Sequence, residues 1–360
     1  MRSIRRSFTG GREGRKWPSS GRIAVAAIAL SMAAAACGSG TASTSSSSST
    51  SSGGGSATQT STSGGGAGGG VTASNVSMPS GTPGKGKPSF TMGDKNFAEE
   101  YIVGQLYYQA LKAKGFSPTL KANIGSSEVI DKAFQSNQVQ LYPEYTGEIV
   151  STVAGQKQGN SAAATYTKAK AFEQAHRSGT LLKQTAFQDV DDLVVKPAFA
   201  HKYHLKTVGD LKNVGPPNGK KVLLGAQPSF QHRYEGVVGI KKAYGVTGLT
   251  FKPLPVGVDY HALDSGSINV ADAFSTDGQL LSGKYVSLKD PKHIFGFQHV
   301  APVVKQSLLK KEGPAFAQTL NWVDSLLTVH AIQTLNAAVQ VKHDQPAAVA
   351  RKFLAANGLK

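Results

Sequence analysis

Strand-like and helix-like patterns alternate along residues 89–360, and this alternation limits the possible folds more than any other feature of the chain. Ser89–Asp94 is a predicted strand, and the apolar residues that follow it from Ile102 to Leu111 recur at the spacing of one helix face. The same order returns with a predicted strand at Ser117–Asn123 and a helical stretch behind it. Alternation of this kind predicts an α/β protein with mostly parallel sheets.

The pattern continues to the C-terminus and closes with a run of helices. Further predicted strands are Val139–Tyr142, Lys221–Leu224, Leu249–Leu254 and Val270–Phe274, and about the last sixty residues have helical apolar spacing. Two α/β units in about 270 residues predict a ligand cleft between them, because ligands of open α/β sheets bind beyond the carboxyl ends of the strands.

The N-terminus resembles an export signal. Seven basic residues precede Ile23–Ala36, which is too short for a membrane span of about 20 residues but fits a secretory signal. Cys37, the one cysteine of the chain, follows directly. We expect residues 1–37 to be a lipoprotein signal peptide, with lipid on Cys37 anchoring the protein to the outer face of the cell membrane. A cleaved signal with a chance cysteine is the alternative, and Arg5–Phe8 leave Sec or twin-arginine export open.

Residues 38–88 are predicted to be a flexible tether. From Gly38 to about Gly70 they are almost wholly Ser, Thr, Gly and Ala, which bury too little apolar surface to fold. The chain carries a net charge of +17, but no arginine-rich stripe interleaved with aromatic residues, so nucleic acid is not an expected partner. A single cysteine excludes an internal disulfide framework and a CxxC metal knuckle.

Polar and aromatic clusters stand next to the predicted strands. Tyr142–Gly147, of sequence YPEYTG, presents two tyrosines and a glutamate at a strand end, where the rings could hold a cation or half-pack against the core. Asp189, Asp191 and Asp192 could bind a cation, serve acid–base chemistry or face solvent. Arg233 is a candidate carboxylate clamp or a surface arginine.

Signatures of catalysis and metal binding are weak in this sequence. His201 and His204 have the i,i+3 spacing of a helical ligand pair, but a metal site needs three or four ligands and no third is close in sequence. The sequence contains no GxSxG motif and no P-loop. We therefore expect no enzyme, no cofactor and no metal.

Seven short motifs follow one another in a fixed order along residues 89–360. They are Gly93–Phe97 with Glu99, Gly125–Glu128, Tyr142–Gly147, Gly236–Gly245, Ala271–Gly278, Ala301–Val304 and Leu335–Asn336. Together they resemble the osmoprotectant (glycine betaine/carnitine/choline) substrate-binding proteins of ABC importers. The PEYTG and STDG blocks are the most specific parts of this resemblance.

The resemblance implies a two-lobed, type II periplasmic-binding-protein fold, with a ligand cleft between lobes joined by a two-strand hinge. Lobe one is expected to comprise residues 89–190 and 300–360, and lobe two residues 191–299. It also implies capture without chemistry. A monomeric, lipid-anchored receptor outside the membrane would take up a quaternary-ammonium osmoprotectant and deliver it to an ABC permease.

The resemblance also assigns ligand-binding residues. In this family an aromatic cage, often of tyrosines, wraps the quaternary ammonium, and basic residues hold a carboxylate if the ligand has one. By motif position Tyr145 matches a cage tyrosine, Lys95 matches the lysine of the first motif, and Arg233 matches the carboxylate-binding arginine. Asn96 and Thr276 belong to the same expected ligand site.

Four positions depart from the family pattern. Glu148 stands where threonine is common, and Asp191, Phe274 and Gln298 stand where the family has tyrosines. We expect Tyr145 and Phe274 to face the cation, with Asp191 or Glu148 as its counter-charge. The altered cage leaves three alternatives open: a receptor for another polar solute (an amine or carboxylate), a lipid-anchored hydrolase using the aspartates, or a receptor that gates a sensor.

Overall fold

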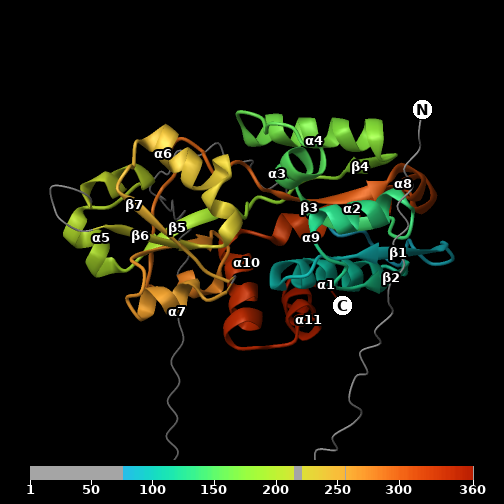
Figure 1. The fold of residues 1–360 in the computed structure, drawn as a ribbon. Helices are drawn as coiled ribbons and strands as arrows, with labels where there is room; N and C mark the ends of the chain where they lie inside the picture. Colours follow the sequence, from blue (N-terminus) through green and yellow to red (C-terminus); the bar gives the residue numbers. More distant parts are fainter. Residues whose placement is uncertain (1–75, 215–220, 256, 360) are drawn as a thin grey trace, which may run out of the picture. The chain divides into compact units, whose positions relative to one another are not determined.

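The computed structural model describes residues 76–214, 221–255 and 257–359 (Figure 1). The expected signal peptide, Cys37 and most of the expected tether lie outside these residues. Within the described ranges, no helix combines the length and the apolar character that crossing a membrane requires.

Two five-stranded sheets form the framework (Figure 1). The first has the order β2-β1-β3-β10-β4, and its strands are β1 (Ser89–Gly93), β2 (Ser117–Lys121), β3 (Leu141–Tyr145), β4 (Gly179–Leu181) and β10 (Val300–Lys305). The second has the order β7-β6-β8-β5-β9, and its strands are β5 (Asp191–Val195), β6 (Val222–Ala226), β7 (Leu249–Pro253), β8 (Val270–Phe274) and β9 (Val286–Ser287). We call the first sheet with its helices lobe one and the second with its helices lobe two.

The strands of each sheet run mostly in one direction, as the sequence pattern predicted, but one strand in each sheet runs the opposite way, so both sheets are mixed. β1 pairs in parallel with β2 and β3, and β6 pairs in parallel with β7 and β8. However, β10 and β5 run antiparallel to their neighbours. Each of these is the first strand after the chain crosses from the other lobe. It therefore starts at the end of the sheet where the parallel strands finish, and the alternation of patterns does not reveal this direction.

Helices cover both faces of the first sheet. One face shares a buried cluster with α1 (Ala98–Ala113), α9 (Pro314–Leu326), α10 (Val329–Asn336) and α11 (Pro346–Ala356). The other face packs against α2 (Ser127–Gln135) and α4 (Ala162–His176). Shorter helical elements of this lobe are α3 (Thr146–Glu148), η1 (Ile149–Val153), α8 (Gln306–Glu312) and η6 (Ala337–Val341).

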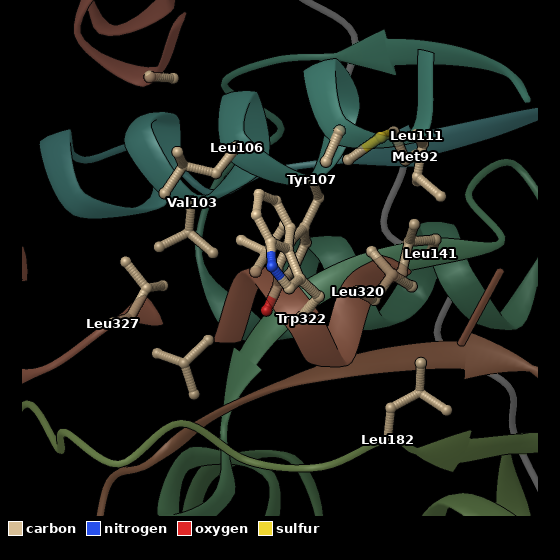
Figure 2. Close-up of a cluster of buried hydrophobic side chains, with 14 of the residues drawn as sticks. Met92, Val103, Leu106, Tyr107, Leu111, Leu141, Leu182, Leu320, Trp322 and Leu327 are labelled. Carbon is tan, nitrogen blue, oxygen red and sulfur yellow. The ribbon is translucent and has the colours of Figure 1, made fainter. Parts of the chain in front are cut away.

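The apolar face of α1 forms the centre of the larger cluster. Figure 2 shows Tyr107 of α1 beside Trp322 of α9, surrounded by leucines from α1, β3 and α9. The Tyr107 hydroxyl is buried there and donates a hydrogen bond of 2.6 Å to Asp324. A buried phenol needs such a partner, because an unpaired polar group in a core is costly.

Lobe two is also covered on both faces. α5 (Pro197–Tyr203), η2 (Val208–Asn213) and α6 (Gly239–Tyr244) pack on one face, and α7 (Asp259–Asp264) packs on the other. The remaining helical turns of this lobe are η3 (Pro228–Gln231), η4 (Tyr234–Val238) and η5 (Gly278–Ser282).

Two chain crossings, residues 182–190 and 288–299, connect the lobes and pair with each other. Gln188 and His299 form an antiparallel bridge, and the Asp189 amide donates to the Gln298 carbonyl at 2.9 Å. These paired segments are the two-strand hinge that the resemblance implied.

The C-terminal helices of lobe one make a further contact with lobe two. Gly278 in η5 packs closely on η6, and a Cβ on Gly278 would lie 2.3 Å from the Cα of Ala337. Only glycine allows this approach. The C-terminal part of lobe one therefore touches the STDG segment of lobe two.

The tether was expected to extend to residue 88, but its last part, residues 76–88, packs against lobe one. Val76 and Met78 pack against the core of lobe one, and the Gly84 amide donates to the Lys114 carbonyl at 2.9 Å. Residues 76–88 therefore belong to the folded part, although they lack the apolar periodicity of a helix or strand.

Candidate functional site

The candidate site lies where the carboxyl ends of strands meet the hinge. β1 is followed directly by Asp94–Phe97, and β3 ends at Tyr145. The hinge segments bring Asp189 and Gln298 to the same region, since Gln298 also accepts a hydrogen bond of 2.9 Å from the Glu148 amide. Residues of lobe one and of both hinge segments therefore converge here, at the strand ends where ligands of open α/β sheets bind.

Lys95 is enclosed in a cluster of charges. Its side chain is 3% exposed, and its Nζ forms a close ion pair with Glu144, donates to Ser127 Oγ at 3.2 Å and lies 3.8 Å from Glu100 Oε1. Burial raises the pKa of Glu100 well above its ordinary value, although the Lys95 charge opposes this rise. The ammonium of Lys95 is therefore already shared by two buried glutamates.

Tyr145 and Phe97 form an aromatic pair beside this cluster. Their ring centroids are 6.1 Å apart at an interplanar angle of 23°, and Lys95 Nζ lies 4.4 Å from the Tyr145 centroid and 5.4 Å from that of Phe97. Tyr145 is 4% exposed, whereas Phe97 is 39% exposed. The Phe97 ring is therefore the accessible member of the pair, and the contact with Lys95 shows that these faces can hold a cation.

Glu99 connects the rings to both lobes. Its Oε1 accepts from the Tyr145 hydroxyl at 2.7 Å, and its Oε2 accepts from the Asn336 amide at 2.8 Å. Asn336 also donates to the Thr276 carbonyl of lobe two at 2.9 Å. A single hydrogen-bonded chain thus runs from the aromatic pair through a buried carboxylate to the STDG segment.

Glu99 and Asp189 form a pair of neighbouring acids. Burial raises the pKa of Glu99, and hydrogen bonds from Thr276, Tyr145 and Asn336 oppose the rise. Burial raises the pKa of Asp189 well above its ordinary value, and the nearby charge of Glu99 raises it further. A cation placed near both groups would favour their ionised forms.

Asp191 and Arg233 form the other charged pair of the site. One guanidinium nitrogen of Arg233, Nη2, donates to Asp191 Oδ1 at 2.7 Å and to Oδ2 at 2.6 Å. The side chains are 10% and 33% exposed respectively. On the neighbouring strand Phe274 lies directly opposite Asp191, and its side chain is half-buried.

The three aspartates of the 189–192 run have separate surroundings. Asp191 pairs with Arg233, whereas Asp192 accepts from the Ser287 hydroxyl, and Asp189 is the neighbour of Glu99. Each of the three aspartates therefore has a different neighbouring group.

The other predicted residues lie as follows. Asn96 is exposed, Thr276 is buried, and Gln298 bonds to Glu148 through both its amide oxygen and, at 3.4 Å, its amide nitrogen. His204 adopts φ 53° just after α5 ends, so it does not share a helix face with His201. Among the residues that the structure describes, no group of three or more His, Cys, Asp or Glu side chains could hold a metal ion.

Comparisons with known proteins agree with this architecture. A sequence profile described as "Substrate binding domain of ABC-type glycine betaine transport system" matches residues 88–356. A glycine-betaine-binding protein of Pseudomonas aeruginosa is 28% identical over 270 residues, 73% of this chain and 86% of that protein. The glycine betaine-binding protein YehZ of Escherichia coli is 27% identical over 276 residues, 74% of this chain and 90% of that one.

A solved structure supports the fold. The crystal structure of a glycine betaine/carnitine/choline ABC transporter protein is 24% identical, with a TM-score of 0.68, and covers 75% of this chain and 99% of its own. The predicted two-lobed, type II binding-protein fold is thus confirmed, and these similar proteins are solute-binding transport proteins rather than enzymes. With a profile match over most of its length, the chain belongs to the family of substrate-binding domains of ABC-type glycine betaine transport systems.

Proposed function

We propose that this substrate-binding protein captures a small quaternary-ammonium solute between its lobes and delivers it to a membrane permease. The observation that carries the proposal is the exposed Phe97 ring stacked on Tyr145, whose hydroxyl is held by the buried carboxylate of Glu99. A ring face next to carboxylates attracts a bulky cation that cannot donate hydrogen bonds, and a desolvated contact of this kind contributes about 2 kcal/mol.

Capture requires that the ligand prefer one arrangement of the lobes. Aromatic rings come from lobe one, Phe274 comes from lobe two, and Asp189 lies on the hinge. A ligand that touches all three binds better when the lobes close around it, and it shifts the equilibrium only by this difference in affinity. A permease that recognises the closed form would then receive loaded protein in preference to empty protein.

Lipid anchoring belongs to the same proposal. Cys37 follows an apolar stretch of signal-peptide length, and a long Ser/Gly/Thr-rich segment separates it from the folded part. Lipid on Cys37 would keep the receptor near its permease at the outer face of the membrane. Mass spectrometry of the membrane fraction should find a diacylglycerol-modified Cys37. Release of a Cys37→Ser variant into the medium would support the anchor, and unchanged membrane association of that variant would contradict it.

A thermal-shift panel on the purified protein tests the ligand class. The panel contains glycine betaine, proline betaine, carnitine and choline, with ectoine and amino acids as compounds lacking a quaternary nitrogen. A ligand that binds only the native state at 100 times its Kd adds about 2.7 kcal/mol to the free energy of unfolding. We expect at least one quaternary amine to raise the melting temperature. A shift produced only by compounds without a quaternary nitrogen would contradict the proposal.

A further inference from the structure

We propose that Asp191 makes the site select a cation without a carboxylate, of the choline type, over a zwitterionic betaine with the same head group. The inference rests on the proposed function, because it assumes that a quaternary ammonium binds at the junction of the lobes. Selection depends on the part of the ligand beyond the quaternary ammonium, which the aromatic rings do not contact.

Arg233 is the residue that the resemblance assigned to a ligand carboxylate. Its Nη2 already donates to both oxygens of Asp191, at 2.7 and 2.6 Å. Its Nε is buried without a hydrogen-bond partner. A ligand carboxylate could displace Asp191, which would leave the Asp191 charge largely buried and unpaired, and breaking such a pair is strongly unfavourable. It could instead share the guanidinium through the unpartnered Nε, but it would then lie beside the Asp191 carboxylate and be repelled by it.

The charges around this pair are mostly negative. Burial raises the pKa of Asp191 to about 6; the Arg233 charge opposes this rise, and the neighbouring Glu148 and Glu235 charges add to it. Asp272 is buried nearby, and its pKa is raised well above its ordinary value by burial and by the Asp191 charge, while Arg233 opposes this rise. A ligand carboxylate entering here would meet acids on several sides.

Lys95 cannot compensate for the loss of Arg233. Its ammonium is 3% exposed and pairs with Glu144 and Glu100. The two cations named here, Lys95 and Arg233, thus stand among eight carboxyl groups: Glu99, Glu100, Glu144, Glu148, Asp189, Asp191, Glu235 and Asp272. This imbalance favours a ligand with net positive charge.

Choline and glycine betaine form a matched pair of probes, because both carry a trimethylammonium group and only glycine betaine carries a carboxylate. We would titrate each into the wild-type protein, Asp191→Asn and Arg233→Gln by calorimetry. The control is Asp264→Asn, which removes one partner of an exposed ion pair with Lys196 in lobe two. An exposed pair contributes little, so this control should behave as wild type.

The wild type should bind choline at least tenfold more tightly than glycine betaine. Asp191→Asn frees the guanidinium, so it should bind glycine betaine at least tenfold more tightly than the wild type does, and choline more weakly. Arg233→Gln should have the opposite effects: it should bind glycine betaine more weakly and choline more tightly than the wild type does. This second variant keeps the test decisive if Asp191→Asn folds poorly. Melting temperatures without ligand report on folding.

The outcomes separate this inference from the proposed function. If both compounds bind the wild type with similar affinity, or if neither variant alters their ratio, the role of Asp191 is refuted while quaternary-ammonium capture stands. If no quaternary amine binds any variant, the proposed function itself is refuted, and this inference with it.

Discussion

Replacing Phe97 with leucine should weaken the binding of a quaternary amine by about 2 kcal/mol, or about 30-fold in Kd. Leucine keeps an apolar side chain of moderate size but removes the ring. Because Phe97 is 39% exposed and precedes α1 without capping it through its side chain, the free energy of unfolding should change little. The effect on binding can thus be measured on a folded protein.

The magnitude depends on how far the contact is desolvated. An exposed cation–π contact contributes about 0.5 to 1 kcal/mol, whereas a desolvated one contributes about 2 kcal/mol or more. In the structure the Phe97 and Tyr145 ring centroids are 6.1 Å apart, and Phe97 is the ring of this pair that is exposed to solvent. If the lobes close over the ligand, the larger figure applies. A loss of only about 2- to 5-fold would indicate that the ring stays wet in the complex.

The assay is isothermal titration of the tightest compound of the panel into wild type, Phe97→Leu and Phe97→Trp. Tryptophan has the strongest ring quadrupole of the aromatic residues, so it should retain or improve affinity. A neutral analogue with a tert-butyl group in place of trimethylammonium should bind wild type and Phe97→Leu about equally. Wild-type affinity of Phe97→Leu for the cationic ligand would refute the role of this ring.

Three further predictions concern the buried polar groups. Lys95→Met leaves Glu144 and Glu100 without their cation and should lower the free energy of unfolding in urea by about 3–5 kcal/mol. If Lys95 instead contacted the ligand, the substitution would weaken ligand binding and leave stability unchanged. Asn336→Ala removes the hydrogen-bond donors of Glu99 and of the Thr276 carbonyl and should lower the free energy of unfolding by about 1–3 kcal/mol. The control Asn357→Ala loses only a local bond to Phe353 and should lower it less. Burial raises the pKa of Glu173 from 4.5 to about 8. The folded state thus binds the extra proton, so stability should fall as the pH rises from 4.5 to 8, and a flat difference between wild type and Glu173→Gln over this range would contradict the assignment.

Strand and helix positions were largely predictable from local pattern. The strand predicted at Val270–Phe274 has the same bounds in the structure. The strand predicted at Val139–Tyr142 instead runs over Leu141–Tyr145, and β10 was not predicted. β3 and β10 each contain a proline, and Pro143 of β3 lies opposite Pro302 of β10. Proline cannot donate to a sheet, so it interrupts the strand pattern even where the strand continues.

Tyr145 was predicted to stand at the end of a strand, and the structure places it there. The sequence did not indicate that the Tyr145 hydroxyl meets Glu99, that Phe97 is the exposed ring, or that Asn336 reaches both lobes. These contacts join residues far apart in sequence, such as Asn336 and Glu99, which are 237 positions apart. Local periodicity contains no information on such pairings. The pairing of Asp191 with Arg233, 42 positions apart, was hidden for the same reason.

The most direct test of the account is a crystal structure of the protein with the tightest quaternary amine of the panel. We expect the quaternary ammonium group within about 6 Å of the Phe97 ring centroid, with Glu99 and Asp189 as the nearest carboxylates. A ligand seated away from the aromatic pair, or one whose quaternary nitrogen points to solvent, would contradict the claim that this junction is the binding site.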